Sequence, residues 1–586
     1  MKNSIVILIL SFVKEEIKLI IKKIKVLYYF VKEFSILRFL CYLIDNSVIP
    51  SRDKIFRNYI LKNTQKWKFR REIINKNTNK YILITSLVNV NHFGYTMSEI
   101  VIGKNLMEMF SSEGVAFIQR YSLKSKLIFE SFGIKKFIFL TDLNFIMRIK
   151  YFLQAYSIIK SCKTMDDFLK FGINNVNIGK VVYDHYLRFT GVGTTNVFDY
   201  KFYVFLSKAL SNYYQIKKNF DKFKFIASVQ SERQFIPSSI VYQSSLTNGI
   251  NVYTRIGPSN TFAVRKYSDA KEMMKPRDRF SKKLCDQIGN IIKEKAVEIG
   301  GNNIEKRFNG IPEYAVSHEY FEERANFPKI KENEKKTVTK KELCEKLGWD
   351  QNKPIVAILA TDLTDGVFEN TWSLFRDNLT WLRETLLEIK NIKNINWLVK
   401  PHPNDKKNKV LTDTISEYKK ICLNHKHILS FPDDVSIASI PKFVHAILTI
   451  KGSASYEYPC FGIPVFQGSE SICSGRGFTI DPKSKEEYFD LLHKIEKISK
   501  LNKHQIDKAK IHVFIYSELT RINVNLLAPF SVVATADSDH VNEKTFWLEM
   551  IKLLDNYKEE EDLLKKMMKI QEKNNDRHTI NYNLLK

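Results

Sequence analysis

The chain has 586 residues, 44% of them hydrophobic and 13% aromatic, which excludes a disordered protein and is more chain than one ordinary core holds. Its 92 basic and 64 acidic residues leave a formal net charge of +28, which favours an anionic membrane surface or an anionic substrate; a lysine-rich proteome would give part of the same excess. Nucleic acid is excluded, because no zinc-finger spacing, RNP motif or basic heptad region is present.

The first 50 residues are predicted to associate with a membrane. The apolar run 5–13 is too short to span a bilayer, and no small-residue cleavage site follows it. From 17 to 34, apolar residues recur at helical spacing with lysines on the other faces, which is typical of a basic amphipathic helix lying on an anionic surface. A helix packed within the protein is the open alternative. The seven cysteines lack CxxC spacing, so we expect reduced thiols in a cytosolic protein.

Residues 51–335 are predicted to form a first Rossmann-like domain. An apolar strand at 81–87 runs into a polar loop, and a helix and another strand follow, which is a βαβ opening. The helices of this domain are predicted at 97–110, 150–171 and 237–248. Its strands are predicted at 81–87, 114–118, 137–140, 225–228 and 250–255. The charged stretch 278–342 is poor in strand residues, so we expect part of it to be linker.

Residues 336–520 are predicted to form a second Rossmann-like domain, and 521–586 a charged helical tail. The strands of the second domain are predicted at 354–361, 396–399, 427–429, 446–449 and 464–466. Helices are predicted at 378–390, 437–443 and 486–501. The fold class expected from this order is α/β, with two Rossmann-like halves facing each other across a cleft.

Polar residues follow two of the strands in the second domain. Lys400 and His402, in the run Lys-Pro-His-Pro, supply positive or switchable charge where one strand ends. Gly452, Ser453 and Ser455 follow another strand and offer N–H groups and hydroxyls at a helix start, which suits a phosphate. One helical turn further on, Glu457 is placed to accept hydrogen bonds from sugar hydroxyls.

These two stretches carry a family resemblance. The Lys-Pro-His-Pro run and Gly452-Ser-Ala-Ser-Tyr-Glu-Tyr-Pro-Cys-Phe-Gly-Ile-Pro464 resemble the C-terminal half of bacterial capsule and surface-polysaccharide glycosyltransferases of the GT-B fold. Bacterial sialyltransferases and Kdo transferases share the His-Pro pair, and the second stretch is similar to the nucleotide loop of UDP-N-acetylglucosamine 2-epimerases. The run 179–188 resembles the same surface-polysaccharide group. The resemblance implies that His402 faces the nucleotide, residues 452–455 face phosphate and Glu457 faces ribose.

Glycosyl transfer also needs a base for the acceptor hydroxyl. The first-domain candidates are His92, Glu99, Asp184 and Glu232, and the order of preference is Glu99, then Asp184, then His92. Glu99 and His92 flank the loop after the first strand. Asp184 lies among Tyr183, His185 and Arg188, and a structural pair between Asp184 and Arg188 is the alternative reading of that cluster.

In the second domain, Asp362 and Asp365 follow the first strand, where they would bind the donor, cap the next helix or act as base. No Asp-x-Asp occurs at this strand end, and GT-B enzymes seldom need a metal, so we expect no metal site and no cofactor besides a nucleotide-sugar co-substrate, CMP- or UDP-linked.

The resemblance and the residues together predict a glycosyltransferase that moves a sugar from a nucleotide-activated donor to a growing capsule or lipopolysaccharide glycan. Its partners would be the nucleotide sugar, a glycan or glycolipid acceptor, the anionic membrane surface and a polysaccharide assembly complex. Its place would be the cytoplasmic face of the inner membrane, held peripherally. Three alternatives remain open: a teichoic-acid-type polyol-phosphate transferase, a UDP-sugar 2-epimerase, and a non-catalytic scaffold of similar fold.

Overall fold

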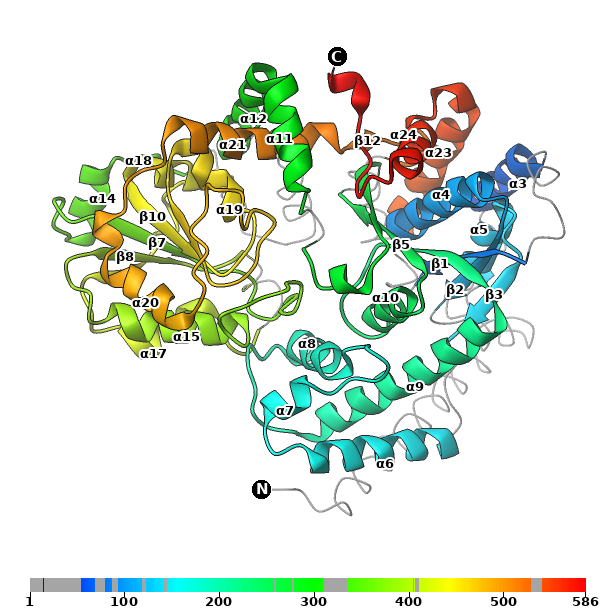
Figure 1. Ribbon diagram of the computed structural model, residues 1–586, viewed down its shortest axis with the longest axis horizontal. Coiled ribbons are helices and arrows are strands. Elements are labelled where there is room, and N and C mark those ends of the chain that lie inside the picture. The colour runs from blue at the N-terminus through cyan, green and yellow to red at the C-terminus, as the bar shows by residue number, and fades with distance from the viewer. Residues whose placement is uncertain are drawn as a thin grey trace.

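Two parallel-stranded sheets organise the chain, and each is covered by helices on both faces (Figure 1). The computed structural model describes residue 14 and residues 54–68, 79–86, 93–118, 123–140, 145–257, 260–276, 279–309, 335–403, 405, 410–528 and 540–585. The predicted N-terminal amphipathic segment therefore lies outside the described residues, apart from Lys14. Within the described part of the chain, no helix is both long and apolar enough to cross a membrane.

The sheet of the first domain has seven strands in the order β12-β6-β5-β4-β1-β2-β3. The strands from β3 to β5 pair in parallel, whereas β6 and β12 add antiparallel edges. Their bounds are β1 Tyr81–Ser86, β2 Glu113–Ile118, β3 Lys136–Phe139, β4 Phe225–Gln230, β5 Asn251–Ile256, β6 Thr261–Tyr267 and β12 Ile522–Asn523.

Alternating side chains divide this sheet between two cores, because successive residues of a strand point to opposite faces. Ile82 and Ile84 pack under one set of helices, and Leu83 packs under the other. The first set is α3 Lys54–Lys68, α4 Phe93–Met109, α5 Leu123–Ser131, α23 His540–Asn556 and α24 Leu563–Asn574. The second set is α6 Phe145–Ser161, α7 Met165–Leu169, α8 Ile178–Thr190, α9 Tyr200–Lys222 and α10 Ser238–Thr247.

The second domain has a five-stranded parallel sheet in the order β11-β10-β7-β8-β9. Its strands are β7 Ile355–Leu359, β8 Asn396–Lys400, β9 Ile428–Ser430, β10 Val444–Thr449 and β11 Val465–Gln467. One face is covered by α15 Asn378–Ile389, α17 Thr414–Cys422 and α20 Lys485–His493. The other is covered by α14 Lys340–Leu347, α18 Ile440–Phe443, α19 Ala454–Glu457 and α21 Lys503–Phe514.

Local sequence explains where these helices begin and end. The Thr339 hydroxyl and the Glu342 carboxylate form a capping box at the start of α14, and Gly348 ends that helix with a φ of 66°. A left-handed residue at this point favours glycine, which carries no Cβ. Asp377 accepts from the Thr380 N–H at 2.8 Å and so starts α15.

The charged stretch that we expected to be partly linker holds two helices, α11 Lys282–Ile291 and α12 Lys293–Phe308. They pack on α21, which leads the chain back to the first domain (Figure 1). The approach of α12 to α21 is close, since a Cβ at Gly300 would collide with the Lys510 carbonyl oxygen. Residues Ala296, Gly300, Ile304 and Phe308 of α12 are buried and recur at every fourth position, which is typical of a helix with one covered face.

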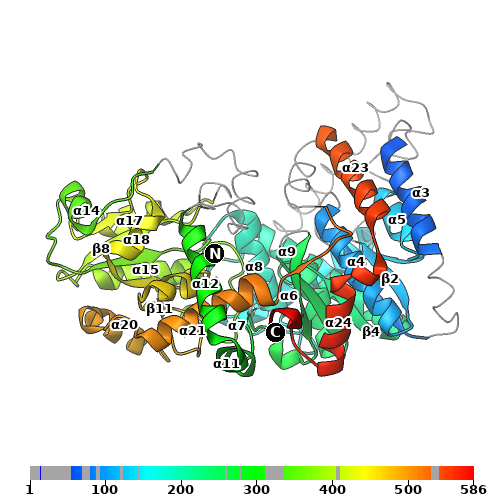
Figure 2. The same ribbon diagram turned by 90° about the horizontal axis from the view of Figure 1, so that it is seen from above.

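The segment 521–586, predicted as a separate tail, is helical but belongs to the first domain. Strand β12 pairs with β6, and α23 and α24 lie beside α3 and α4 in both views (Figures 1 and 2). Trp547 of α23 is fully buried, with its ring centroid 4.8 Å from that of Phe56 and 5.0 Å from that of Tyr59. The tail is thus part of the first hydrophobic core.

The predicted fold class is confirmed: α/β, with two Rossmann-like domains. The expected strands 81–87, 225–228, 354–361 and 446–449 correspond to β1, β4, β7 and β10. The expected helix 150–171 is two helices, α6 and α7, because Thr164 caps a new helix with its hydroxyl. Strands β6 and β12 were not predicted.

We predict that Trp547→Ala lowers the free energy of unfolding by about 3–5 kcal/mol, because it leaves a cavity against Phe56 and Tyr59. The matched control is the neighbouring Leu548→Ala, whose side chain is 53% exposed and whose loss should cost less than about 0.5 kcal/mol. Chemical denaturation of the full chain measures both. Equal losses in the two variants would show that α23 does not contribute to the core.

Candidate functional site

The carboxyl ends of three neighbouring strands in the second domain bring its predicted site loops together. β7 lies between β8 and β10, with Leu359 opposite Lys400 and Ile358 opposite Leu448. The loops that carry Asp362, His402 and Lys451 therefore leave the same edge of the sheet. This edge faces α8 and α10 of the first domain (Figure 1), and side chains from the two domains pair across the junction.

His402 lies among charged groups. Burial lowers its pKa to about 4, Lys400 acts in the same direction, and Asp362 opposes both. The imidazole is therefore neutral at pH 7 and serves as a hydrogen-bonding group rather than a cation. Asp362 accepts from the Thr364 N–H at 3.0 Å and pairs with Arg188 of α8 at 3.3 Å, so it links this loop to the first domain.

The loop after β10 begins with Lys451, whose Nζ donates to the Gly366 carbonyl oxygen. Gly452 follows with a φ of 112°, a conformation that favours glycine. Within the described part of the chain, the N–H groups of Gly452 and Ser453 donate to no acceptor. These two amides are thus available to an anion.

The buried Thr361 hydroxyl of the β7 loop likewise has no hydrogen-bond partner among the described residues. A Cβ at Gly452 would lie 3.8 Å from the Thr361 Cγ2, so the two loops are adjacent. The hydroxyl and the two amides therefore offer three free polar groups in one neighbourhood.

Ser455 and Glu457 are turned into the protein. The buried Ser455 hydroxyl donates to the Gly452 carbonyl at 2.6 Å, so it orders the loop. The buried Glu457 carboxylate pairs with Arg307 of α12 at 2.7 Å. The helix that they belong to, α19, has a single turn. Contact of Ser455 with phosphate and of Glu457 with ribose both stay predictions.

Glu99 of α4 lies at the carboxyl end of the first sheet. Its Oε1 accepts from the N–H of Ser231, which follows β4, at 2.6 Å. Burial raises the pKa of Glu99 to about 8, although the Ser231 hydrogen bonds and nearby Arg255 oppose the shift. The Arg255 guanidinium lies over the Tyr95 ring at 4.4 Å. His92 lies outside the described residues.

Asp184 of α8 is buried at the domain junction. Its Oδ1 accepts from the Val367 N–H of the second domain at 3.0 Å. Burial raises its pKa to about 8, Asp365 and Glu369 add to the shift, and Lys451 opposes it. A carboxyl with this pKa holds its proton near neutrality and exchanges it readily, which suits an acid or base.

The pair between Asp184 and Arg188, which was the alternative reading of this cluster, does not form, because Arg188 reaches across the junction to Asp362. Tyr183 and His185 do not orient Asp184 either. The Tyr183 hydroxyl donates to Asp377 at 2.7 Å, and the His185 Nδ1 accepts from the Ile236 N–H at 3.3 Å. Consecutive residues on a helix point about 100° apart, so Tyr183 and His185 are directed away from Asp184.

Three further residues complete the site, and no local signal marked their role. Arg233, almost fully buried, donates its Nε to Glu369 at 2.8 Å across the junction. Glu369, Asp184 and Asp365 surround Lys451, and burial lowers the pKa of that lysine. The loop after β4 thus connects Glu99, through Ser231, to the cluster at the junction, through Arg233.

Asp184, Asp362, Asp365, Lys400, His402 and Lys451 therefore form one neighbourhood, which spans both domains. Glu99 lies on the first-domain side of it. Among the residues that the structure describes, no group of three or more His, Cys, Asp or Glu side chains is arranged to hold a metal ion.

No protein-family model and no curated protein matches this chain. Similar solved structures include the β-Kdo 2,4-transferase KpsC of Thermosulfurimonas dismutans, 11% identical over 54% of this chain and 88% of that one, with a TM-score of 0.30. A Rickettsia africae glycosyltransferase is 11% identical over 82% of this chain and 100% of that one, with a TM-score of 0.23.

The Neisseria meningitidis UDP-GlcNAc 2-epimerase bound to UDP-GlcNAc is 9% identical over 80% of this chain and 99% of that one, with a TM-score of 0.23. At these scores, the function has to be argued from the geometry of the site itself.

We predict that Asp184→Asn flattens the dependence of stability on pH. In the folded protein the Asp184 carboxyl keeps its proton up to a pH of about 8, whereas in the unfolded chain it ionises near 3.8. Between these values the unfolded state binds fewer protons, so wild-type stability falls as the pH rises. The Asp184→Asn amide oxygen still accepts from Val367 and carries no charge.

The Asp184→Asn variant should therefore melt above the wild type at pH 8 and lose that advantage near pH 4. Thermal unfolding at several pH values measures this, with the exposed Asp221→Asn as the matched control. A difference in melting temperature that is the same at both pH values would contradict the buried, protonated carboxyl.

Proposed function

We propose that this protein is a glycosyltransferase that moves a sugar from a nucleotide-activated donor, CMP- or UDP-linked, to a growing capsule or lipopolysaccharide glycan. The observation that carries the proposal is the cluster at the domain junction. There, Lys451 of the second domain lies beside the buried carboxyl of Asp184 from the first, and Lys400 and the open amides of Gly452 and Ser453 lie on loops that leave the same edge of the second sheet.

Each part of the cluster matches a requirement of the reaction. Negative charge develops on the nucleotide phosphate as the sugar leaves, and fixed N–H groups and cations stabilise it. The Gly452 and Ser453 amides, with Lys451 and Lys400 nearby, would supply this stabilisation. Neutral His402 would donate or accept a hydrogen bond on the nucleotide.

On the first-domain side, a carboxyl near neutral pKa takes the proton of the acceptor hydroxyl as it attacks. Glu99 and Asp184, each with a pKa raised to about 8 by burial, are the described candidates. His92 completes the proposed set. Asp362 and Asp365 would hold the donor. Both lie on the loop after β7, in the donor domain, and both are near Arg188 of α8.

The proposal extends to the place of the reaction. An acceptor that is a growing surface glycan is tied to the membrane, and the basic amphipathic pattern of residues 17–34 suits a peripheral position on the inner face of the inner membrane. A polysaccharide assembly complex would be its partner there. The reaction would use a nucleotide sugar and no further cofactor.

The donor site is tested by nucleotide binding. CMP or UDP should raise the melting temperature, because a ligand that binds the native state stabilises it by mass action. His402→Ala should weaken the preferred nucleotide by about ten- to a hundredfold, the cost of losing one hydrogen bond to a charged partner.

The exposed His504→Ala of α21 is the matched control for His402→Ala, and it should bind like the wild type. Calorimetric titration gives each affinity. Equal binding by the two variants would remove His402 from the donor site, and no binding of either nucleotide by the wild type would overturn the proposed function.

The base is tested by transfer rate measured beside nucleotide affinity. Removal of the general base should lower the rate by about 10²–10⁴-fold and leave the nucleotide bound, because the donor contacts come from the other domain. We expect this of Glu99→Gln first, then of Asp184→Asn, then of His92→Ala.

The exposed Glu298→Gln of α12 is the control for a lost carboxylate and should keep the wild-type rate. Near-normal transfer in all three candidate variants would exclude a first-domain base. Epimerisation of the donor sugar without acceptor would contradict glycosyl transfer.

A further inference from the structure

A second hollow lies at the opposite end of the second sheet. It has a volume of about 850 Å³ and is lined where β7 and β10 begin, at Ile355 and Val444. The candidate donor site lies where these strands end. Six residues of extended chain separate the two ends of β10 by about 20 Å, so the two sites are distinct.

Positive charge is concentrated around this hollow. Lys340, Lys442, Lys497 and Lys500 line it, and Glu496 is the one acidic side chain of the lining. None of the four lysines pairs with a carboxylate of the described residues. Glu496 is engaged elsewhere, since its Oε2 accepts from the Asn394 Nδ2 at 2.5 Å. The charge of the hollow is therefore left for a ligand to offset.

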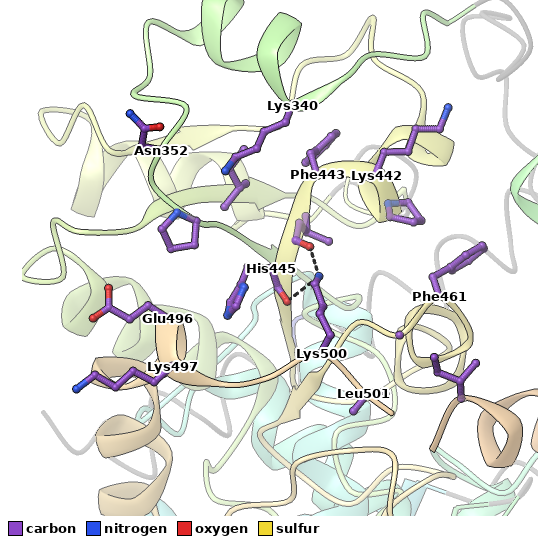
Figure 3. Close-up of a pocket in the computed structure, with 16 residues that line it drawn as sticks. Lys340, Asn352, Lys442, Phe443, His445, Phe461, Glu496, Lys497, Lys500 and Leu501 are labelled. Atoms are coloured by element: carbon purple, nitrogen blue, oxygen red, sulfur yellow. Dashed lines mark hydrogen bonds between the residues drawn. The ribbon is translucent and has the colours of Figure 1, made fainter. Parts of the chain in front are cut away.

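Two of the lysines are directed inward. The Lys340 ammonium extends to the side of the hollow where His445 and Lys500 lie, whereas those of Lys442 and Lys497 extend outward (Figure 3). Lys500 is held in place, with its Nζ 2.6 Å from the Val444 carbonyl oxygen and 3.2 Å from that of His445. The His445 Nε2 is 2.9 Å from the Ile495 carbonyl, so it carries the proton.

The rest of the lining is apolar or neutral. Phe443 and Phe461 lie along one side, and the Phe461 ring is fixed by Phe308, with the two centroids 4.9 Å apart. Asn352 adds an amide that donates and accepts hydrogen bonds. The lining thus offers the half-buried Phe461 ring and an amide beside two inward-directed cations, which suits a ligand with hydroxyls, an apolar ring face and a negative group.

We propose that this hollow binds an acidic saccharide, with its carboxylate or phosphate between Lys340 and Lys500 and its ring against Phe461. The proposal rests on the proposed function for the origin of the saccharide, which would be an acidic unit of the growing surface glycan. Such a site would hold the chain of the glycan on the far side of the donor domain during repeated transfer.

The inward direction of Lys340 and Lys500 favours this ligand over a membrane surface. A flat anionic surface would contact the outward-pointing Lys442 and Lys497, because it cannot enter the hollow. A phosphate group alone would leave the half-buried Phe461 ring facing water. Substitution of the inward pair, Lys340 and Lys500, should therefore affect saccharide binding, whereas substitution of the outward pair, Lys442 and Lys497, should affect membrane binding.

The test uses the full chain and a defined probe, trigalacturonic acid, with neutral maltotriose as its uncharged counterpart. The acidic trisaccharide should bind and the neutral one should not. Lys340→Gln and Lys500→Gln should each weaken binding by about tenfold, the loss of one contact to a charged group. Lys442→Gln, which removes the same charge from the rim, is the matched control.

The imidazole of His445 reports on the site. Burial lowers its pKa, and Lys500 and Lys340 lower it further, while the carbonyl of Ile495 opposes them. A carboxylate bound between the two lysines offsets their charge and should raise the pKa of His445. Histidine-labelled NMR titration measures this with and without trigalacturonic acid, and the loss of one signal in His445→Asn assigns the resonance.

Three results would overturn the proposal. Pyrophosphate binding as tightly as the trisaccharide would make the hollow a phosphate site. Binding to phosphatidylglycerol vesicles that depends on Lys442 and Lys497 would make this face a membrane contact. Trisaccharide binding that survives Lys340→Gln and leaves the His445 pKa unchanged would place the ligand elsewhere. These experiments measure binding to the hollow, so an absence of glycosyl transfer would contradict the proposed function and would leave the proposed saccharide site unaffected.

Discussion

The docking of the loop 361–371 of the second domain on the first fixes the relation of the two sheets. Val367 of this loop is buried in the first domain's core beneath α8 and α10, and the Phe368 ring lies 5.9 Å from that of Tyr183. Full burial of a side chain such as that of Val367 contributes about 1.5–3 kcal/mol. The same loop gives its Val367 N–H to Asp184 and its Gly366 carbonyl to Lys451. The apolar packing of this loop therefore fixes where Asp184 and Lys451 lie relative to each other.

The electrostatics of the junction follow from that packing. Once the loop covers Asp184, the carboxyl loses water, and its pKa rises because burial disfavours the charged form. The same burial lowers the pKa of Lys451. Ion pairs around the cluster, such as Arg188 with Asp362 and Arg233 with Glu369, hold the neighbouring charges in fixed positions. The site is preorganised by contacts that no single domain could make.

The sequence predicted what depends on short stretches of chain. Apolar runs at 81–87 and 354–361 predicted the buried strands β1 and β7, and the polar loops after them marked one edge of each sheet. Strand β6 was not predicted, because the charged residues Arg265 and Lys266 lie in its interior. Lys266 is neutralised by Glu572, which lies 306 residues later in the chain. The pairing of Arg188 with Asp362 was not predicted either, because Asp362 lies in the other domain. Contacts between distant segments leave no local period to read.

The return of the chain to β12, α23 and α24 makes the second domain an insertion within the first. During synthesis, the second domain from α14 to α21, with α11 and α12 that pack on it, emerges before β12, α23 and α24. The first domain has to wait for its last sixty residues, and until Trp547 arrives Phe56 and Tyr59 have no partner ring from α23. The half of the protein that is made first is therefore the half that is finished last, and its unfinished core is the surface that a chaperone would meet.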